Sequence, residues 1–252
     1  MCIINPSINM KLTLVGAGPG DADLITIKGI KALQQADAIL YDALVNEEIL
    51  DFALPHIPKI FVGKRFGNHY LKQEEINELI VQYAVKYGNI VRLKGGDSFV
   101  FGRGMEEIEY AQCFGIATEV VPGISSALGV PALLGIPMTH RGSSESFWVL
   151  TGTTKDHELS QDIVLASQSK ATLVILMAMH KLAQIVAIFE TAGKENTPVA
   201  IIQNGTLPHQ KVVVGTVGDI VGKAEKEGLS SPAIIVVGEV VSKLGLTQKC
   251  CL

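Results

Sequence analysis

Two glycine-rich segments of this 252-residue sequence have the composition of loops that bind ligands. The first is Val15-Gly-Ala-Gly-Pro-Gly-Asp21, and the second is Arg92-Leu-Lys-Gly-Gly-Asp-Ser-Phe-Val-Phe-Gly-Arg-Gly104. Each follows a short apolar run. Glycine lets a backbone approach a ligand closely, so we expect a Cβ at Gly95 or Gly96 to occupy ligand space. The alternative for the second segment is a turn closed by Asp97, with its basic residues in solvent.

The first segment is similar to a dinucleotide-binding fingerprint but departs from it. The glycines stand at Gly16, Gly18 and Gly20, and Asp21 occupies the place of the third fingerprint glycine. Pro19 has no backbone N–H to offer a pyrophosphate, and Asp21 would repel one. The segment therefore favours a ligand without phosphates. A tight turn that binds nothing and a phosphate site stay open as alternatives.

Asp42 and several basic residues come just after predicted strands. Asp42 follows the run Ala38–Tyr41 and is a candidate site residue, the alternative being a cap for the next helix. Ligands of open α/β sheets bind outside the carboxyl ends of the strands, so the basic residues there could converge on one anionic ligand. These residues are Lys64, Arg65, Lys94, Arg103 and Arg141. Arginine suits carboxylates and phosphates alike, and the first glycine-rich segment leads us to prefer a carboxylate.

The histidines and cysteines give no sign of a metal site or a disulfide framework. The six histidines lack ligand spacing, and so do Cys2, Cys113, Cys250 and Cys251. We therefore expect no metal and a reducing, cytoplasmic setting. Met177 lies on an apolar strand, where a methionine would ordinarily fill the core.

Composition narrows the class of protein further. Hydrophobic residues make up 48% of the chain and charged residues 18%, which is enough apolar surface for a substantial core. The formal charge of -4 gives no global positive field for nucleic acid. Residues 1–10 lack a basic residue and a long apolar run, and no apolar stretch is long enough to cross a bilayer. We expect neither a signal peptide nor a membrane partner.

Short β-branched runs alternate with helical patterns along the chain, which predicts an α/β fold. The predicted strands are Leu12–Val15, Ala38–Tyr41, Ile60–Val62, Ile90–Leu93, Thr118–Val121, Phe147–Leu150, Leu173–Leu176, Val199–Ile202, Val212–Val214 and Ile234–Val237. Apolar residues at Ile76, Leu79, Ile80 and Tyr83 mark one helix between them.

The strands fall into two groups, which predicts two α/β domains with mixed sheets flanked by helices. An antiparallel pair is expected in the second sheet, because its last three strands are closely spaced and Asn204-Gly205 is typical of a turn. The segments Gly135–Pro137 and Gly142–Ser146 place the boundary near residue 140. The predicted domains are 1–139 and 140–252, with the active site in the cleft between them.

Six motifs in this order resemble those of the tetrapyrrole (corrin/porphyrin) methylases. They are Val15–Asp21, Gly63–Arg65, Leu93–Asp97, Phe101–Gly104, Val121–Ile124 and Gly135–Arg141. The resemblance runs from Lys11 to about Val241, including Gln203–Thr206 and Ser231–Ile235. Its Gly-Lys-Arg and Thr-His-Arg elements favour the members that methylate uroporphyrinogen III. They disfavour three other kinds of member: the precorrin methylases, diphthine synthase and the ribosomal RNA methylases.

This resemblance implies two α/β domains, a homodimer, and S-adenosylmethionine in the interdomain cleft, with S-adenosylhomocysteine as its product. The implied reaction methylates two ring carbons of uroporphyrinogen III to give precorrin-2, a precursor of siroheme and cobalamin. A cofactor without phosphates and a polycarboxylate substrate agree with the glycine-rich segments and the basic residues described above.

Site roles also follow from the resemblance, position by position. It implies that Asp42 is the proton acceptor and Lys64 the proton donor. Arg65, Arg103 and Arg141 would then bind substrate carboxylates. The implied cofactor contacts are Pro19, Gly95, Gly96, Asp97, Val100, Ser125, Ser126, Met177 and Gly205.

The sequence departs from the family's commonest pattern in several places. Ala43 stands where an arginine usually follows the aspartate, and its loss could weaken carboxylate binding near Asp42. Ser98 replaces proline, Ser125-Ser126 replaces Thr-Ala, and Met177-Ala-Met179 replaces Met-Gly-Leu. Three other functions stay open: a precorrin methyltransferase, a nicotinamide-dependent oxidoreductase, and a non-catalytic module that binds anions.

Overall fold

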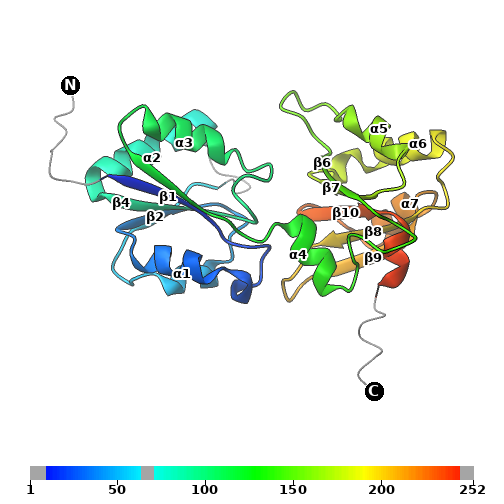
Figure 1. Ribbon diagram of the computed structural model, residues 1–252, viewed down its shortest axis with the longest axis horizontal. Helices are drawn as coiled ribbons and strands as arrows, with labels where there is room; N and C mark the ends of the chain where they lie inside the picture. The colour runs from blue at the N-terminus through cyan, green and yellow to red at the C-terminus, as the bar shows by residue number, and fades with distance from the viewer. Residues whose placement is uncertain (1–9, 64–70, 245–252) are drawn as a thin grey trace, which may run out of the picture. The chain divides into compact units, whose positions relative to one another are not determined.

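The computed structural model describes residues 10–63 and 71–244. The contacts within the chain divide it into two units, Met1–Ser125 and Ser126–Leu252, whose elements are labelled in Figure 1. The sequence placed this boundary near residue 140, where glycine and proline mark turns. The boundary falls earlier because helix α4 (Ser126–Leu133) contacts strands of the second unit.

The sheet of the first unit is parallel throughout, with the strand order β3-β2-β4-β1-β5 in the described residues. Its strands are β1 (Lys11–Gly16), β2 (Ala38–Tyr41), β3 (Lys59–Phe61), β4 (Asn89–Lys94) and β5 (Ala117–Val121). Each predicted strand of this unit is therefore confirmed, with ends shifted by a residue at most. The sheet itself is parallel rather than mixed, because helical segments connect its strands.

Helices cover both faces of this sheet (Figure 1). One face packs under α1 (Ile27–Gln34) and the 3-10 helix η2 (Glu47–Phe52), and the other under α2 (Gln73–Tyr87) and α3 (Gly104–Gln112). Side chains alternate along β4, so Val91 and Leu93 join the first core and Ile90 joins the second. Helix α1 begins at Thr26, whose hydroxyl accepts from the Gly29 N–H at 3.0 Å.

The second unit is built on a mixed sheet with the strand order β6-β7-β10-β8-β9 in the described residues. Its strands are β6 (Phe147–Thr151), β7 (Thr172–Leu176), β8 (Pro198–Gln203), β9 (Lys211–Thr216) and β10 (Ala233–Val237). Strands β8 and β9 form the predicted antiparallel pair. Strand β10 lies between β7 and β8 and runs antiparallel to both, so β7 and β8 point the same way.

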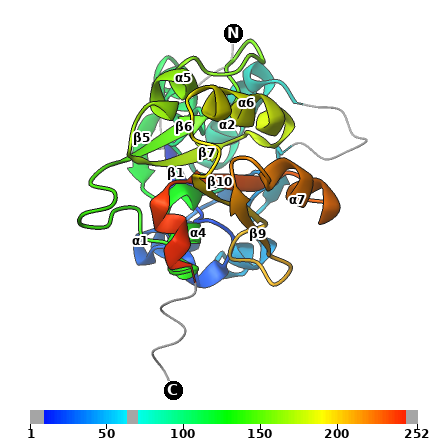
Figure 2. The same cartoon turned by 90° about the vertical axis from the view of Figure 1, so that its right-hand side faces the viewer.

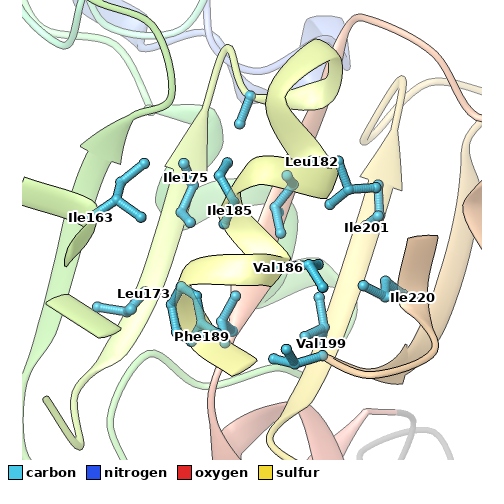
Figure 3. Close-up of a cluster of buried hydrophobic side chains, with 14 of the residues drawn as sticks. Ile163, Leu173, Ile175, Leu182, Ile185, Val186, Phe189, Val199, Ile201 and Ile220 are labelled. Carbon is cyan, nitrogen blue, oxygen red and sulfur yellow. The ribbon is translucent and has the colours of Figure 1, made fainter. Parts of the chain in front are cut away.

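Three helices bury one face of the second sheet: α5 (Asp162–Ser167), α6 (Leu182–Thr191) and α7 (Ile220–Lys226). Figure 3 shows Phe189 and Ile185 of α6 among Leu173, Val199 and Ile220 of this core. Figure 2 shows α5 and α6 together on the side of the sheet away from α4. The remaining 3-10 helices are η1 (Ala22–Leu24), η3 (Met179–Lys181) and η4 (Glu239–Lys243). Among the residues described, no helix has the length and apolar character needed to cross a membrane.

Candidate active site

The loops after β1 and β4 leave the first sheet toward opposite faces. The chain passes from β1 to α1 on one face and from β4 to α3 on the other, although β1 and β4 are neighbours. In open α/β sheets, ligands bind outside the carboxyl ends of strands at such a point. This edge of the first unit is therefore the candidate site, as the sequence predicts.

Main-chain hydrogen bonds join these two loops. The Gly96 N–H donates to the Gly18 carbonyl at 2.7 Å, and the Gly18 N–H donates to the Gly96 carbonyl at 3.2 Å. The Ala17 N–H donates to the Lys94 carbonyl at 2.8 Å. These amides are thus satisfied within the protein, and Pro19 has none to give. The donors of the first loop suit a ligand without phosphates better than a pyrophosphate.

Asp97 ties a third loop, which follows β5, to the same place. Its Oδ1 accepts from the Phe99 N–H at 2.8 Å. Asp97 thus closes a local turn, which was the alternative predicted for the second glycine-rich segment. Its Oδ2 accepts from the Gly123 N–H at 3.0 Å. A Cβ on Gly123 would stand 2.2 Å from the Gly96 carbonyl oxygen, so only glycine lets the loops approach this closely.

Protein atoms, rather than open ligand space, explain the need for glycine at Gly95. A Cβ there would stand 2.8 Å from the Cβ of Leu44. Gly96 has a φ of 68°, a conformation that favours glycine whatever its surroundings. The prediction that a Cβ would fill ligand space is therefore wrong at Gly95, because the segment after Asp42 packs there.

The Asp42 carboxylate lies at the end of β2 and is 27% exposed. Its Oδ1 accepts from Nη2 of Arg92 at 2.5 Å. The helix cap that was the alternative role is taken by Asn46, whose side chain accepts from the Glu48 N–H at 3.1 Å. Asp42 is thus a partly exposed carboxylate held by a buried guanidinium at the edge of the sheet.

Sequence reasoning missed the buried charges beneath Asp42. Arg92 is 2% exposed and Glu107, on α3, is fully buried. Arg92 Nε donates to Glu107 Oε1 at 3.2 Å, and Lys94 Nζ donates to the same oxygen at 3.0 Å. The signal was present, because a strand covered by helices on both faces must bury Arg92 and requires a partner for it.

Lys94 therefore does not join the predicted group of ligand-binding cations. Its side chain is 5% exposed, and burial together with the nearby Arg92 charge lowers its pKa. The alternation along β4 explains this placement, since Ile90, Arg92 and Lys94 share the face that α2 and α3 cover.

The predicted substrate-binding arginines differ in their surroundings. Arg103 is about half exposed and holds Glu106 through Nε at 2.8 Å and Nη2 at 2.5 Å, which raises the Arg103 pKa. Arg141 is exposed. Lys64 and Arg65 lie outside the described residues. Gly63 is the last described residue before them, and a Cβ on it would stand 2.3 Å from the Ala43 nitrogen.

The other predicted cofactor contacts of the first unit lie in the same three loops. Pro19 is half-buried after β1, Val100 is half-buried after β4, and Ser125 is buried after β5. The structure thus brings these residues to one edge with Gly95, Gly96 and Asp97.

Met177, Gly205 and Ser126 belong to the second unit. Met177 follows β7 and is 48% exposed with a φ of 54°, so it does not fill the core. Gly205 follows β8, and a Cβ on it would stand 2.4 Å from Val130 of α4, the helix that Ser126 begins. Because β7 and β8 point the same way, Met177 and Gly205 lie at the same edge of the second sheet.

Metal ligation finds no support in the part of the chain that the structure describes. No group of three or more histidine, cysteine, aspartate or glutamate side chains there could hold an ion.

Parallel strands followed by glycine-rich loops that are hydrogen-bonded together, with a carboxylate beside them, are typical of an α/β protein that binds a ligand at this edge of the sheet. The chain belongs to the tetrapyrrole (corrin/porphyrin) methylase family, whose model matches residues 11–221.

Two relatives and one solved structure show how far the similarity extends. The chain is 48% identical to the uroporphyrinogen-III C-methyltransferase of Methanocaldococcus jannaschii, over 93% of this chain and 98% of that protein. It is 47% identical to a siroheme synthase of Actinobacillus pleuropneumoniae, over 94% of this chain but only 48% of that protein. Thus the chain spans about half the length of the siroheme synthase. The uroporphyrin-III C-methyl transferase of Thermus thermophilus, solved with S-adenosyl homocysteine, matches with a TM-score of 0.80 and 35% identity, over 92% of this chain and 99% of that one.

Proposed function

We propose that this chain is an S-adenosylmethionine-dependent methyltransferase that methylates two ring carbons of uroporphyrinogen III to give precorrin-2. The observation that carries the proposal is the similarity to the Methanocaldococcus jannaschii enzyme, which extends over nearly all of both chains.

The donor set at the first-unit edge fits this cofactor. The Gly18 and Gly96 N–H groups each donate to the other residue's carbonyl, and the Ala17 N–H donates to the Lys94 carbonyl. Pro19 has no N–H group to donate. A nucleotide cofactor with a pyrophosphate would need such amides free, whereas S-adenosylmethionine has no phosphate. The residues proposed to contact it are Pro19, Gly95, Gly96, Asp97, Val100 and Ser125 in the first unit, and Ser126, Met177 and Gly205 in the second.

When bound, S-adenosylmethionine supplies an electrophilic methyl group on a positively charged sulfur. The chain's part is then to align the substrate, which is worth about 7 to 11 kcal/mol in favourable cases, and to move protons. After a ring carbon has taken the methyl group from sulfur, the macrocycle carries a positive charge and loses a proton from another position; Asp42 accepts that proton, a role typically worth about 10²- to 10⁴-fold. Lys64 is the proposed proton donor.

Substrate carboxylates are proposed to bind Arg65, Arg103 and Arg141. Arg103 already holds Glu106, so a substrate carboxylate must replace that partner or share the guanidinium with it. Ala43 provides no charge beside Asp42, which leaves these three arginines as the proposed anchors. We also propose that the protein is a cytoplasmic homodimer that binds neither nucleic acid nor membrane. Light scattering on the purified protein tests the dimer.

An anaerobic incubation with uroporphyrinogen III and S-adenosylmethionine tests the reaction. Mass spectrometry should show two added methyl groups. Unmodified substrate, in a tube where a known uroporphyrinogen methylase reacts, would refute the proposal. In a thermal-shift assay, S-adenosylhomocysteine should raise the melting temperature and NAD should not. The opposite result would favour the oxidoreductase.

Asp42→Asn tests the base within this reaction. The amide keeps the shape of the side chain but accepts no proton, so kcat should fall about 10²-fold or more. The matched control is Asp51→Asn, which changes an exposed aspartate of η2 and should leave kcat unchanged. Normal turnover of the Asp42→Asn protein would remove Asp42 from the mechanism.

A further inference from the structure

Glu107 is a fully buried carboxylate on the face of the first sheet that α2 and α3 cover. One of its oxygens, Oε1, accepts three hydrogen bonds: from Lys94 Nζ at 3.0 Å, from Arg92 Nε at 3.2 Å and from Gln73 Nε2 at 3.3 Å. Two of these donors are cations. The proposed reaction has so far given this group no role.

Both cations also face Asp42. Arg92 reaches Asp42 with Nη2 at 2.5 Å while its Nε holds Glu107. Lys94 Nζ lies 3.8 Å from Asp42 Oδ2, beyond hydrogen-bonding distance, but 3.0 Å from Glu107. Two buried cations are thus shared between two carboxylates, and Glu107 holds the lysine away from Asp42.

We propose that Glu107 is a positioning residue for the Asp42 base, an inference that rests on the proposed methyltransferase reaction. A carboxylate oxygen that is hydrogen-bonded to a cation is less available to accept a proton from substrate, so a hydrogen bond from Lys94 would engage the second oxygen of Asp42 as Arg92 engages the first. The interaction is strong here, since little water screens the buried pairs. By engaging Lys94, Glu107 leaves Asp42 Oδ1 hydrogen-bonded to Arg92 and keeps Lys94 Nζ at 3.8 Å from Oδ2, beyond hydrogen-bonding distance.

Glu107→Gln tests this role with little change of shape. The variant removes one negative charge, so Lys94 should turn to Asp42 as its remaining counter-charge. We expect kcat to fall about 10-fold or more, as a weakened base requires. KM and the affinity for S-adenosylhomocysteine should stay near wild type. The control is Glu109→Gln, which removes an exposed carboxylate from the same helix and should leave kcat unchanged.

A double variant separates charge balance from simple packing. Lys94→Met combined with Glu107→Gln removes one cation and one anion together, so Asp42 again faces Arg92 alone. We expect this double variant to recover most of the lost kcat. It also keeps the inference testable if the single variant does not fold. A double variant that folds but turns over as slowly as Asp42→Asn would overturn the proposal, as would a Glu107→Gln protein with normal kcat.

A readout without substrate separates this inference from the proposed function. Crystal structures of the wild type and of Glu107→Gln should show Lys94 Nζ moving from 3.8 Å to hydrogen-bonding distance of Asp42. An unmoved lysine would overturn the inference even if the enzyme is active. If the wild type does not methylate uroporphyrinogen III, the proposed function fails, and the crystal structures still decide whether Glu107 controls the contacts of Asp42.

Discussion

Replacing Asp97 with asparagine should loosen the loops that the candidate site is built from. The carboxylate accepts from two backbone amides, Phe99 N–H at 2.8 Å and Gly123 N–H at 3.0 Å. An asparagine has one acceptor oxygen, so one of these amides must face the side-chain NH₂ instead. A hydrogen bond to a charged acceptor is worth about 1.5 to 3 kcal/mol. Because Asp97 is only half-buried, we take the lower value, which corresponds to about a tenfold easier opening of the loop.

Amide hydrogen exchange measures this opening directly. Either Phe99 or Gly123 should exchange about tenfold faster in Asp97→Asn than in the wild type. Calorimetry should show weaker binding of S-adenosylhomocysteine, since both the loop after β4 and the loop after β5 are proposed to contact it. The control is Asp23→Asn, an exposed aspartate in the loop after β1. Wild-type exchange at both amides of Asp97→Asn would refute the reasoning.

Two further predictions address packing and charge. Gly123→Ala should lower the free energy of unfolding in urea by about 1 to 3 kcal/mol and abolish S-adenosylhomocysteine binding, because the new Cβ would stand 2.2 Å from the Gly96 carbonyl oxygen. The control is Gly222→Ala on α7, where a Cβ would have nothing within 4 Å. This control should stabilise the fold by up to about 1 kcal/mol. Hydrogen bonds from Lys11 and Lys28 lower the Glu119 pKa to about 2, so the stability that Glu119 provides is present above its ordinary pKa of 4.5 and is lost as the pH falls toward 2. Since the Glu119 side chain is 36% exposed, Glu119→Gln should lower the free energy of unfolding by only about 1 kcal/mol at pH 7. If the variant remained less stable than the wild type at pH 2 or in 1 M salt, the ion pairs with Lys11 and Lys28 would not be the cause.

The strands were the most predictable part of this protein. Every predicted strand is present, because short β-branched runs that alternate with helical patterns are a strong local signal of extended chain. Their order within the sheets was less accessible. The place of β10 between β7 and β8 depends on long-range packing, and no local pattern encodes it. For the same reason the boundary at Ser125 was missed, since α4 joins the second unit through contacts rather than through its own sequence.

The basic residues show where reasoning from the sequence stopped short. Their positions after strands predicted a single cluster facing an anion, but position along the chain does not say which face of a strand a side chain takes. Lys94 shares the covered face of β4 with Arg92, and both donate hydrogen bonds to Glu107 of α3. Arg103 and Arg141 are exposed instead. Buried cations that already have partners are poorly placed to bind a substrate, so among the described members of that cluster we propose only these two arginines as carboxylate-binding residues. Arg103 donates two hydrogen bonds to Glu106, so an incoming carboxylate must compete with a partner already in place. Arg141 has no comparable ion pair among the described residues. The first carboxylate to dock should therefore depend more on Arg141 than on Arg103.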